Sequence, residues 1–180
     1  EINASKIPLS NIKGEIRKIE NVIIENYKNP EPTSSVHPGC WYKEFATPLE
    51  AIEYIGLSNL RSVDWEYNTK GANIEVVGNK KGEIETICLM SFYEKDSVRM
   101  QTRATVYTDK YMGEMKTGLT TTEPLEFHDN YVSTNQNVLY HIVGANKKEN
   151  GTFKYVNDAY LVLDNILYHL NLVFEQKDMG

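Results

Sequence analysis

Consecutive short strand-like segments, some alternating between apolar and polar residues and one nearly continuously apolar, constrain the fold of this chain most strongly. Between residues 63 and 107 such segments are separated by turn residues, as at 78–82 and 94–97. Strands joined by short turns pair as hairpins, so the pattern predicts an antiparallel sheet. We expect strands over 63–67, 72–77, 83–93 and 98–107, with a turn at 68–71 between the first two.

A further hairpin is predicted near the end of the chain. Asp164 and Asn165 separate the apolar runs 159–163 and 166–174, and both residue types tolerate the positive φ of a tight turn. In the second run, apolar residues at every second position form one face of a strand: Ile166, Tyr168, Leu170, Leu172 and Phe174. Residues 137–144 add another strand, and residues 124–137 form a loop or a weak edge strand.

A short helix with both ends marked precedes these strands. Thr47 is a good N-cap, and Pro48 suits the first helical position. Glu50 lies three residues after Thr47, as a capping box requires, and Gly56 suits the left-handed residue that ends a helix. The apolar residues expected on one face of the helix are Leu49, Ala51, Ile52 and Ile55.

The rest of the chain divides at the boundaries of this region. Apolar residues three and four apart predict a helical extension within residues 1–29, although a strand is the alternative for its second half. Residues 30–46 are rich in Pro and read as a linker, whose aromatic end packs back on the domain. Residues 47–180 form an α+β domain, with a twisted antiparallel sheet of about six or seven strands backed by one or two helices.

Charge and hydropathy exclude some partners. The net charge is −6 and the basic residues are scattered, which argues against a nucleic-acid surface. No apolar run reaches the roughly 18 residues of a membrane span. The chain starts at Glu1 without Met. A removed signal peptide, or a membrane anchor upstream of Glu1, would explain this start, and so would a fragment cut at a domain boundary.

Sequence motifs do not indicate an enzyme. The GxSxG, GxxxxGK[ST] and GxGxxG patterns are missing. His37 and Cys40 have H-x-x-C spacing without the further ligands of a metal site, so we expect no metal and no cofactor. Cys40 and Cys88 allow one disulfide, but an inert buried thiol is favoured for Cys88. We read His128 as part of a turn and His141 as a residue of a strand face.

Aromatic residues are the candidate binding residues. The chain has twelve tyrosines, and tyrosine suits both half-buried sheet faces and binding surfaces. Packing on the sheet is the simpler interpretation, and an exposed aromatic groove that holds a ligand or a peptide is the alternative. The candidates are Trp41, Trp65, Tyr67, Tyr107, Tyr111 and Tyr160.

Two segments carry a resemblance to a known family. Residues 45–57 (FATPLEAIEYIGL) and 158–168 (DAYLVLDNILY) resemble the opening helix and a later hairpin of a family of Gram-positive bacterial domains of unknown function. The proline-centred stretch that should follow the helix is missing from residues 58–62. Members are secreted, lipid-anchored, or the outer part of anti-sigma-factor-like membrane proteins. The resemblance therefore implies an extracellular or cell-surface location and a sensing or binding role, but no functional residue.

Three hypotheses of function remain. The first is a non-enzymatic extracytoplasmic binding or sensory domain of a bacterial surface protein, whose partner is an unknown small molecule or protein. The second is a carrier of an apolar, lipid-like ligand on the concave face of the sheet, which requires a continuous apolar cavity. The third is a hydrolase with a site in the loop at 108–136, which requires titratable side chains that meet in a cleft.

Overall fold

The computed structural model describes residues 18, 40–57, 59–62, 68–96, 98–113, 126–132, 138–147 and 152–177. Its elements are β1 (Cys40–Phe45), α1 (Pro48–Ile55), β2 (Asn68–Gly78), β3 (Ile84–Lys95), β4 (Val98–Tyr107), β5 (Glu126–Val132), β6 (Val138–Lys147), β7 (Thr152–Leu163) and β8 (Ile166–Lys177). The predicted helix in residues 1–29 and the predicted strand 63–67 lie outside the described residues.

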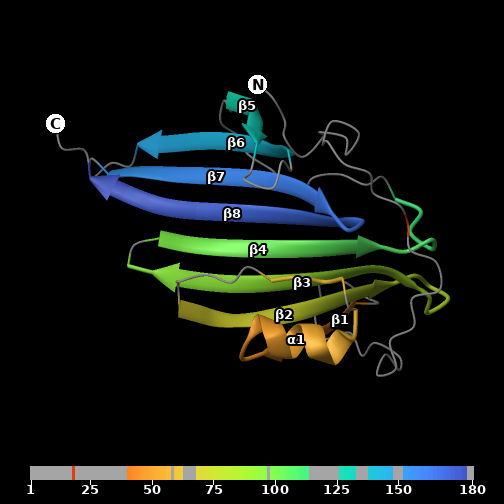
Figure 1. Ribbon diagram of the computed structural model, residues 1–180. Helices are drawn as coiled ribbons and strands as arrows, with labels where there is room; N and C mark the ends of the chain where they lie inside the picture. The colour runs from red at the N-terminus through yellow and green to blue at the C-terminus, as the bar shows by residue number, and fades with distance from the viewer. Residues whose placement is uncertain are drawn as a thin grey trace.

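The strands form one antiparallel sheet, and α1 packs on one of its faces (Figure 1). The sheet has eight strands in the order β1-β2-β3-β4-β8-β7-β6-β5. The prediction of an antiparallel sheet backed by a helix is therefore confirmed, with more strands than the six or seven expected. Within the described part of the chain, no helix is long and apolar enough to cross a membrane.

The sheet consists of two meanders that share one seam. Strands β1 to β4 pair in chain order, and so do β5 to β8. The last strand of each meander pairs with the other, β4 with β8, so the first strands β1 and β5 lie at the two outer edges (Figure 1). The edge position of β5 agrees with the weak edge strand predicted for residues 124–137.

Both predicted ends of the helix are confirmed. The Thr47 Oγ1 atom accepts a hydrogen bond of 3.2 Å from the backbone N–H of Glu50. The Glu50 carboxylate accepts one of 3.2 Å from the N–H of Ala46, one residue before the position that the standard capping box uses. Gly56 has φ +71° and donates its N–H to the Ile52 carbonyl at 3.0 Å, which closes the last turn.

The buried face of α1 differs from the prediction at one residue. Pro48, Ala51 and Ile55 are buried against the sheet, and Ile52 packs beside them. Leu49 is 62% exposed, so its predicted place on this face is wrong. Successive helical residues are about 100° apart, and Leu49 follows Pro48 around the helix into solvent.

The hydrophobic core lies between α1 and the first four strands. Its members on the sheet alternate along β2, β3 and β4 and include the first residue of β8. The most deeply buried of them are Ile74, Val76, Ile87, Val106 and Ile166. The period of two in the sequence therefore marks one real face, and α1 covers this face over β1, β2 and β3.

Two predicted boundaries of the sheet are wrong. Residues 68–71 form the start of β2 instead of a turn, because a bulge between Thr69 and Gly71 lets the strand continue. Gly71 has φ +113°, and a Cβ atom there would lie 3.1 Å from the Phe45 carbonyl oxygen, so only glycine suits this position. Residues 40–45, the predicted end of the linker, form β1 and pair with β2.

The C-terminal hairpin is confirmed at its turn. Asp164 has φ +49° and Asn165 has φ +66°, and these two residues alone connect β7 to β8. Positive φ at both positions is the signature of a type I′ turn, whose twist matches that of the flanking strands. Strand β7 begins at Thr152, earlier than the expected Ala159, so the hairpin has twelve residues in each arm.

Candidate ligand-binding site

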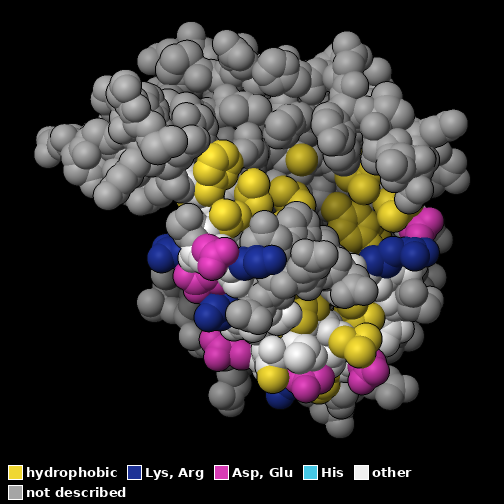
Figure 2. All heavy atoms as spheres, turned by 60° about the vertical axis from the view of Figure 1, so that its left-hand side comes forward, with side chains coloured by type: hydrophobic (Ala, Val, Ile, Leu, Met, Phe, Trp, Pro, Cys, Tyr) yellow, Lys and Arg dark blue, Asp and Glu magenta, His cyan; other side chains and the backbone are white. Residues whose placement is uncertain are grey.

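The helix side of the sheet contains an apolar pocket beside the core. Helix α1 contacts β1, β2 and β3, and no described element covers this side of β4, β8 and β7. A cavity of about 320 Å³ opens there. The apolar side chains that line it are Leu89, Ala104, Ala159, Leu161, Leu163 and Leu170. Hydrophobic side chains gather in a recessed part of the surface in Figure 2, with Lys and Arg side chains beside them.

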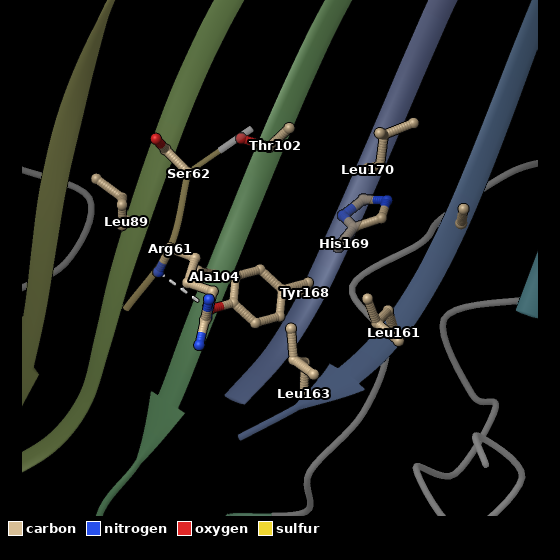
Figure 3. Close-up of a pocket in the computed structure, with 11 residues that line it drawn as sticks. Arg61, Ser62, Leu89, Thr102, Ala104, Leu161, Leu163, Tyr168, His169 and Leu170 are labelled. Atoms are coloured by element: carbon tan, nitrogen blue, oxygen red, sulfur yellow. Dashed lines mark hydrogen bonds between the residues drawn. The ribbon is translucent and has the colours of Figure 1, made fainter. Parts of the chain in front are cut away.

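The register of the strands explains why a cavity forms. Ala104 on β4 is the cross-strand neighbour of both Leu89 on β3 and Tyr168 on β8. Ala159 on β7 is likewise opposite Leu170 on β8. Two small alanines therefore lie among large side chains on one sheet face, and the larger neighbours form walls around the space above them (Figure 3).

A short segment after the helix forms one wall of the pocket. This segment, here called the strap, comprises Leu57 and residues 59–62. The backbone N–H of Arg61 donates to the Tyr168 hydroxyl at 3.1 Å, and this hydroxyl donates to the Asn59 carbonyl at 3.4 Å. Leu60 is buried in the core. Figure 3 shows Arg61 and Ser62 across from the leucines of β7 and β8.

The strap is also joined to the β7–β8 turn. The Asn59 Nδ2 atom donates to the backbone carbonyl of Asp164 at 3.1 Å. Arg61 Nη2 lies 3.1 Å from Asp164 Oδ2, in an ion pair whose side chains are 65% and 45% exposed. Such an exposed pair adds little stability because water screens it. The strap is therefore held mainly by Leu60 and by hydrogen bonds to the hairpin.

Few polar groups line the pocket, and they lie on the side of the strap. Arg61, Ser62, Thr102 and the Tyr168 hydroxyl are its polar side-chain groups, apart from His169, whose strand position alternates to the other sheet face. Burial raises the pKa of Tyr168, against the opposing effect of Arg61. The hydroxyl therefore stays neutral and keeps both of its hydrogen bonds at physiological pH. No carboxylate belongs to the described lining.

The predicted aromatic candidates that the structure describes do not form one cluster, although two of them are in contact. Trp41 stacks on Tyr54 of the helix, with ring centroids 6.0 Å apart. Tyr107 and Tyr111 meet at the end of β4, with centroids 5.0 Å apart. Tyr160 is buried on the opposite side of the sheet.

Tyr160 stacks on the ring of His169, with a centroid distance of 4.5 Å. None of the four described candidates lines the apolar pocket. The remaining two, Trp65 and Tyr67, lie outside the described residues.

The two cysteines are free thiols on the face opposite the helix. Cys40 is on β1 and Cys88 on β3, with β2 between them. Two strand spacings amount to roughly 10 Å, beyond the roughly 7 Å that a disulfide can span between Cα atoms. Burial raises the pKa of Cys88 to about 11, and burial together with the Glu75 carboxylate raises that of Cys40 to about 11. Both thiols are therefore protonated and unreactive near pH 7.

The strand predicted for His141 is confirmed, whereas the turn predicted for His128 is wrong. His128 lies on β5 rather than in a turn, directly paired with His141 on β6. His37 is outside the described residues. Where side chains are described, no group of three His, Cys, Asp or Glu residues has an arrangement that could hold a metal ion. Of the loop at 108–136, the structure describes residues 108–113 and 126–132.

A second pocket, at the far end of β3 and β4, has a lining of charged and apolar side chains. It measures about 400 Å³ and includes Glu94 between two cations. Lys70 Nζ and Arg99 Nε lie 3.6 and 3.8 Å from the Glu94 carboxylate oxygens. One carboxylate is thus shared by two cations, and all three side chains are exposed to solvent. The apolar pocket better fits the usual composition of a ligand site, with mostly apolar walls and a few polar groups.

Comparisons with protein-family models, with curated proteins and with solved structures found no match. The geometry of the site is therefore the basis on which a function can be argued.

Proposed function

We propose that this chain is a non-enzymatic binding domain that holds an apolar small molecule in the pocket between the strap and strands β4, β8 and β7. The observation that carries the proposal is the pocket itself, a space of about 320 Å³ with apolar walls and polar groups on one side. Small-molecule sites have volumes from roughly 300 Å³ upward and this same composition. An apolar ligand would bury the part of this apolar sheet face that α1 does not cover.

The position of the pocket on rigid elements supports binding. Its floor is formed by β4 and β8, which are the two central strands of the sheet. The wall opposite is fixed by the hydrogen bonds of Tyr168 to the strap. A pocket whose walls are held before a ligand arrives loses less conformational entropy on binding.

The resemblance in sequence adds a cellular setting to the proposal. The two similar segments, 45–57 and 158–168, contain α1 and the β7–β8 turn, and the strap connects these two parts. They therefore border the pocket. We place the domain outside the cytoplasm of a bacterium, as a secreted or anchored sensor or as a carrier that delivers its ligand. The hydrolase alternative places its site in the loop at 108–136, and neither of the two pockets described above includes a residue of that loop.

A titration with a neutral apolar fluorophore tests this proposal. N-phenyl-1-naphthylamine fluoresces strongly only in an apolar environment, and we expect a saturable increase with one site per chain. The variant Ala159→Leu fills the pocket floor with a larger side chain and should abolish the increase. Ala46→Leu makes the same chemical change at an exposed position before α1 and is the matched control.

The outcomes separate the hypotheses. Saturable binding that Ala159→Leu removes, and Ala46→Leu leaves intact, supports the pocket as the site. Circular dichroism and thermal unfolding of each variant show whether the fold is retained. Absence of saturable binding, or binding that a folded Ala159→Leu protein retains in full, contradicts the proposal.

A further inference from the structure

We propose that the ligand is a single-chain amphiphile with an anionic head, and that Arg61 pairs with this head at the mouth of the pocket. This inference rests on the proposed function, because it specifies the ligand of the same site. It adds a polar end to the apolar molecule, and it assigns the recognition of that end to one residue.

The permanent charge in the described pocket lining is positive. Arg61 is the permanently charged residue among the described lining, and the lining contains no Asp or Glu. The other polar side chains there, Ser62 of the strap and Thr102 of β4, carry neutral hydroxyls that can donate hydrogen bonds to an anion. A carboxylate or a similar anion therefore finds an attractive potential at this wall, whereas an ammonium group finds a repulsive one.

Most of the hydrogen-bond donors of the Arg61 side chain are not used within the described structure. A guanidinium group has five N–H donors in a planar fork, and the described structure uses one side-chain nitrogen of Arg61, in the contact of 3.1 Å with Asp164. The side chain is 65% exposed, so its remaining donors face solvent near the pocket. Arginine commonly binds a carboxylate through two parallel N–H···O bonds, and this free edge can do so.

The backbone of Arg61 is fixed independently of its side chain. Its N–H donates to the Tyr168 hydroxyl, whose ring belongs to the pocket wall (Figure 3). A substitution of the Arg61 side chain thus leaves the hydrogen bond that holds the strap. This separation allows the head group to be tested without loss of the pocket.

Asp164 should oppose the head group. Its carboxylate is 3.1 Å from the guanidinium and partly neutralises the charge that the ligand would meet. Asp164→Asn removes this competing charge, and asparagine tolerates the positive φ of +49° at this turn position. We therefore expect this variant to bind an anionic amphiphile more tightly than the wild type does.

Displacement of N-phenyl-1-naphthylamine by three ten-carbon amphiphiles tests the inference. Decanoate, decanol and decylammonium share one chain and differ in the charge of the head. We expect decanoate to bind about fivefold more tightly than decanol, and decylammonium most weakly. Arg61→Gln should reduce the affinity for decanoate about fivefold without changing that for decanol, and Arg61→Lys should retain part of the preference. The preference should also fall between 0.05 and 0.5 M salt, because salt screens exposed charges.

Each result has a distinct meaning. If decanol equals decanoate, or if Arg61→Gln affects both alike, the assignment to Arg61 is wrong while the apolar site stands. If decylammonium binds best, the charge of the head is the opposite of that proposed. If no amphiphile displaces the fluorophore and the fluorophore itself does not bind, both the proposed function and this inference fail.

Discussion

The hydroxyl of Tyr168 on β8 accepts a hydrogen bond of 3.1 Å from the backbone N–H of Arg61, more than one hundred residues earlier in the chain. The same hydroxyl donates to the Asn59 carbonyl. The Tyr168 side chain of the β7–β8 hairpin thereby fixes the strap, which follows α1. The contact joins the two parts of the molecule that border the pocket.

Tyr168→Phe should destabilise the protein by about 1 kcal/mol, because it leaves two backbone groups of the strap without this partner. Urea unfolding measures the loss, and hydrogen exchange at the Arg61 amide should become faster. Tyr54→Phe is the control, since its hydroxyl has no hydrogen bond to a described residue. An Arg61 amide that remains equally protected in Tyr168→Phe would contradict the role given to this hydroxyl.

Thr47→Ala should reduce the free energy of unfolding by about 1 kcal/mol, because the Glu50 N–H then loses its capping acceptor. Leu49→Ala changes a larger side chain in the same helix, yet it should have a smaller effect because Leu49 is largely exposed. Chemical denaturation of the two variants in parallel decides the order. A greater loss in Leu49→Ala would mean that this leucine is buried after all.

Asn165→Ala should destabilise the β7–β8 hairpin by about 1 kcal/mol, because alanine tolerates the φ of +66° poorly. Asn165→Gly should be much closer to the wild type, since glycine adopts this conformation without steric cost. Thermal unfolding of both variants tests the turn. Equal melting temperatures would show that positive φ at this position is not required.

Stability should fall as the pH rises from about 9 to about 11, in part because of Cys88. Its pKa is raised from the ordinary 9.0 to about 11 in the folded protein, so in this window the unfolded chain loses a proton that the folded chain keeps. The stabilisation from the neutral Cys88 thiol is complete below pH 9. Urea unfolding across this range should show a shallower decline for Cys88→Ala than for the wild type, and identical slopes would refute the assignment.

The reactivity of the two cysteines offers a simpler check of their protonation and their separation. Native protein should react slowly with a thiol reagent at pH 7.5 and fully after unfolding, since both cysteines are protonated in the fold. Mild oxidation should not produce an intramolecular disulfide. Its formation would place Cys40 and Cys88 much closer than strands separated by β2 allow.

The sequence predicted those elements whose signals are local. The ends of α1 depend on Thr47, Pro48 and Gly56, which act within one turn of helix, and the structure confirms them. The Asp164–Asn165 turn also follows from two adjacent residues. Strand β4 matches its predicted bounds because the turn before it and the alternation within it agree.

Features that depend on distant pairing were missed. The start of β2 contains turn-like residues, and it is a strand only because β1 and β3 pair with it around a bulge. Likewise β1 was predicted as the end of a linker, because an isolated six-residue segment does not reveal an edge strand. The register of β4 with β8 pairs residues that are 62 to 74 positions apart, and nothing local specifies it.

Part of the pocket could be predicted from the sequence. The alternation that includes Tyr168 and Leu170 correctly marks a hydrophobic face, and one short helix is too small to cover the whole face. The position of Ala104 and Ala159 among larger neighbours depends on register and could not be read from the chain. Prediction therefore centred on the aromatic residues, which the structure distributes over separate sites.

The seam between β4 and β8 has a consequence for how the protein is made. The first meander emerges from the ribosome with β4 unpaired on its inner side, and its pairing partner is the last of the described strands along the chain. The two halves of the sheet can therefore join only after residues 167–173 of β8 have been synthesised. Until then β4 presents an open edge to neighbouring chains, so this protein should depend on protection from aggregation during its synthesis.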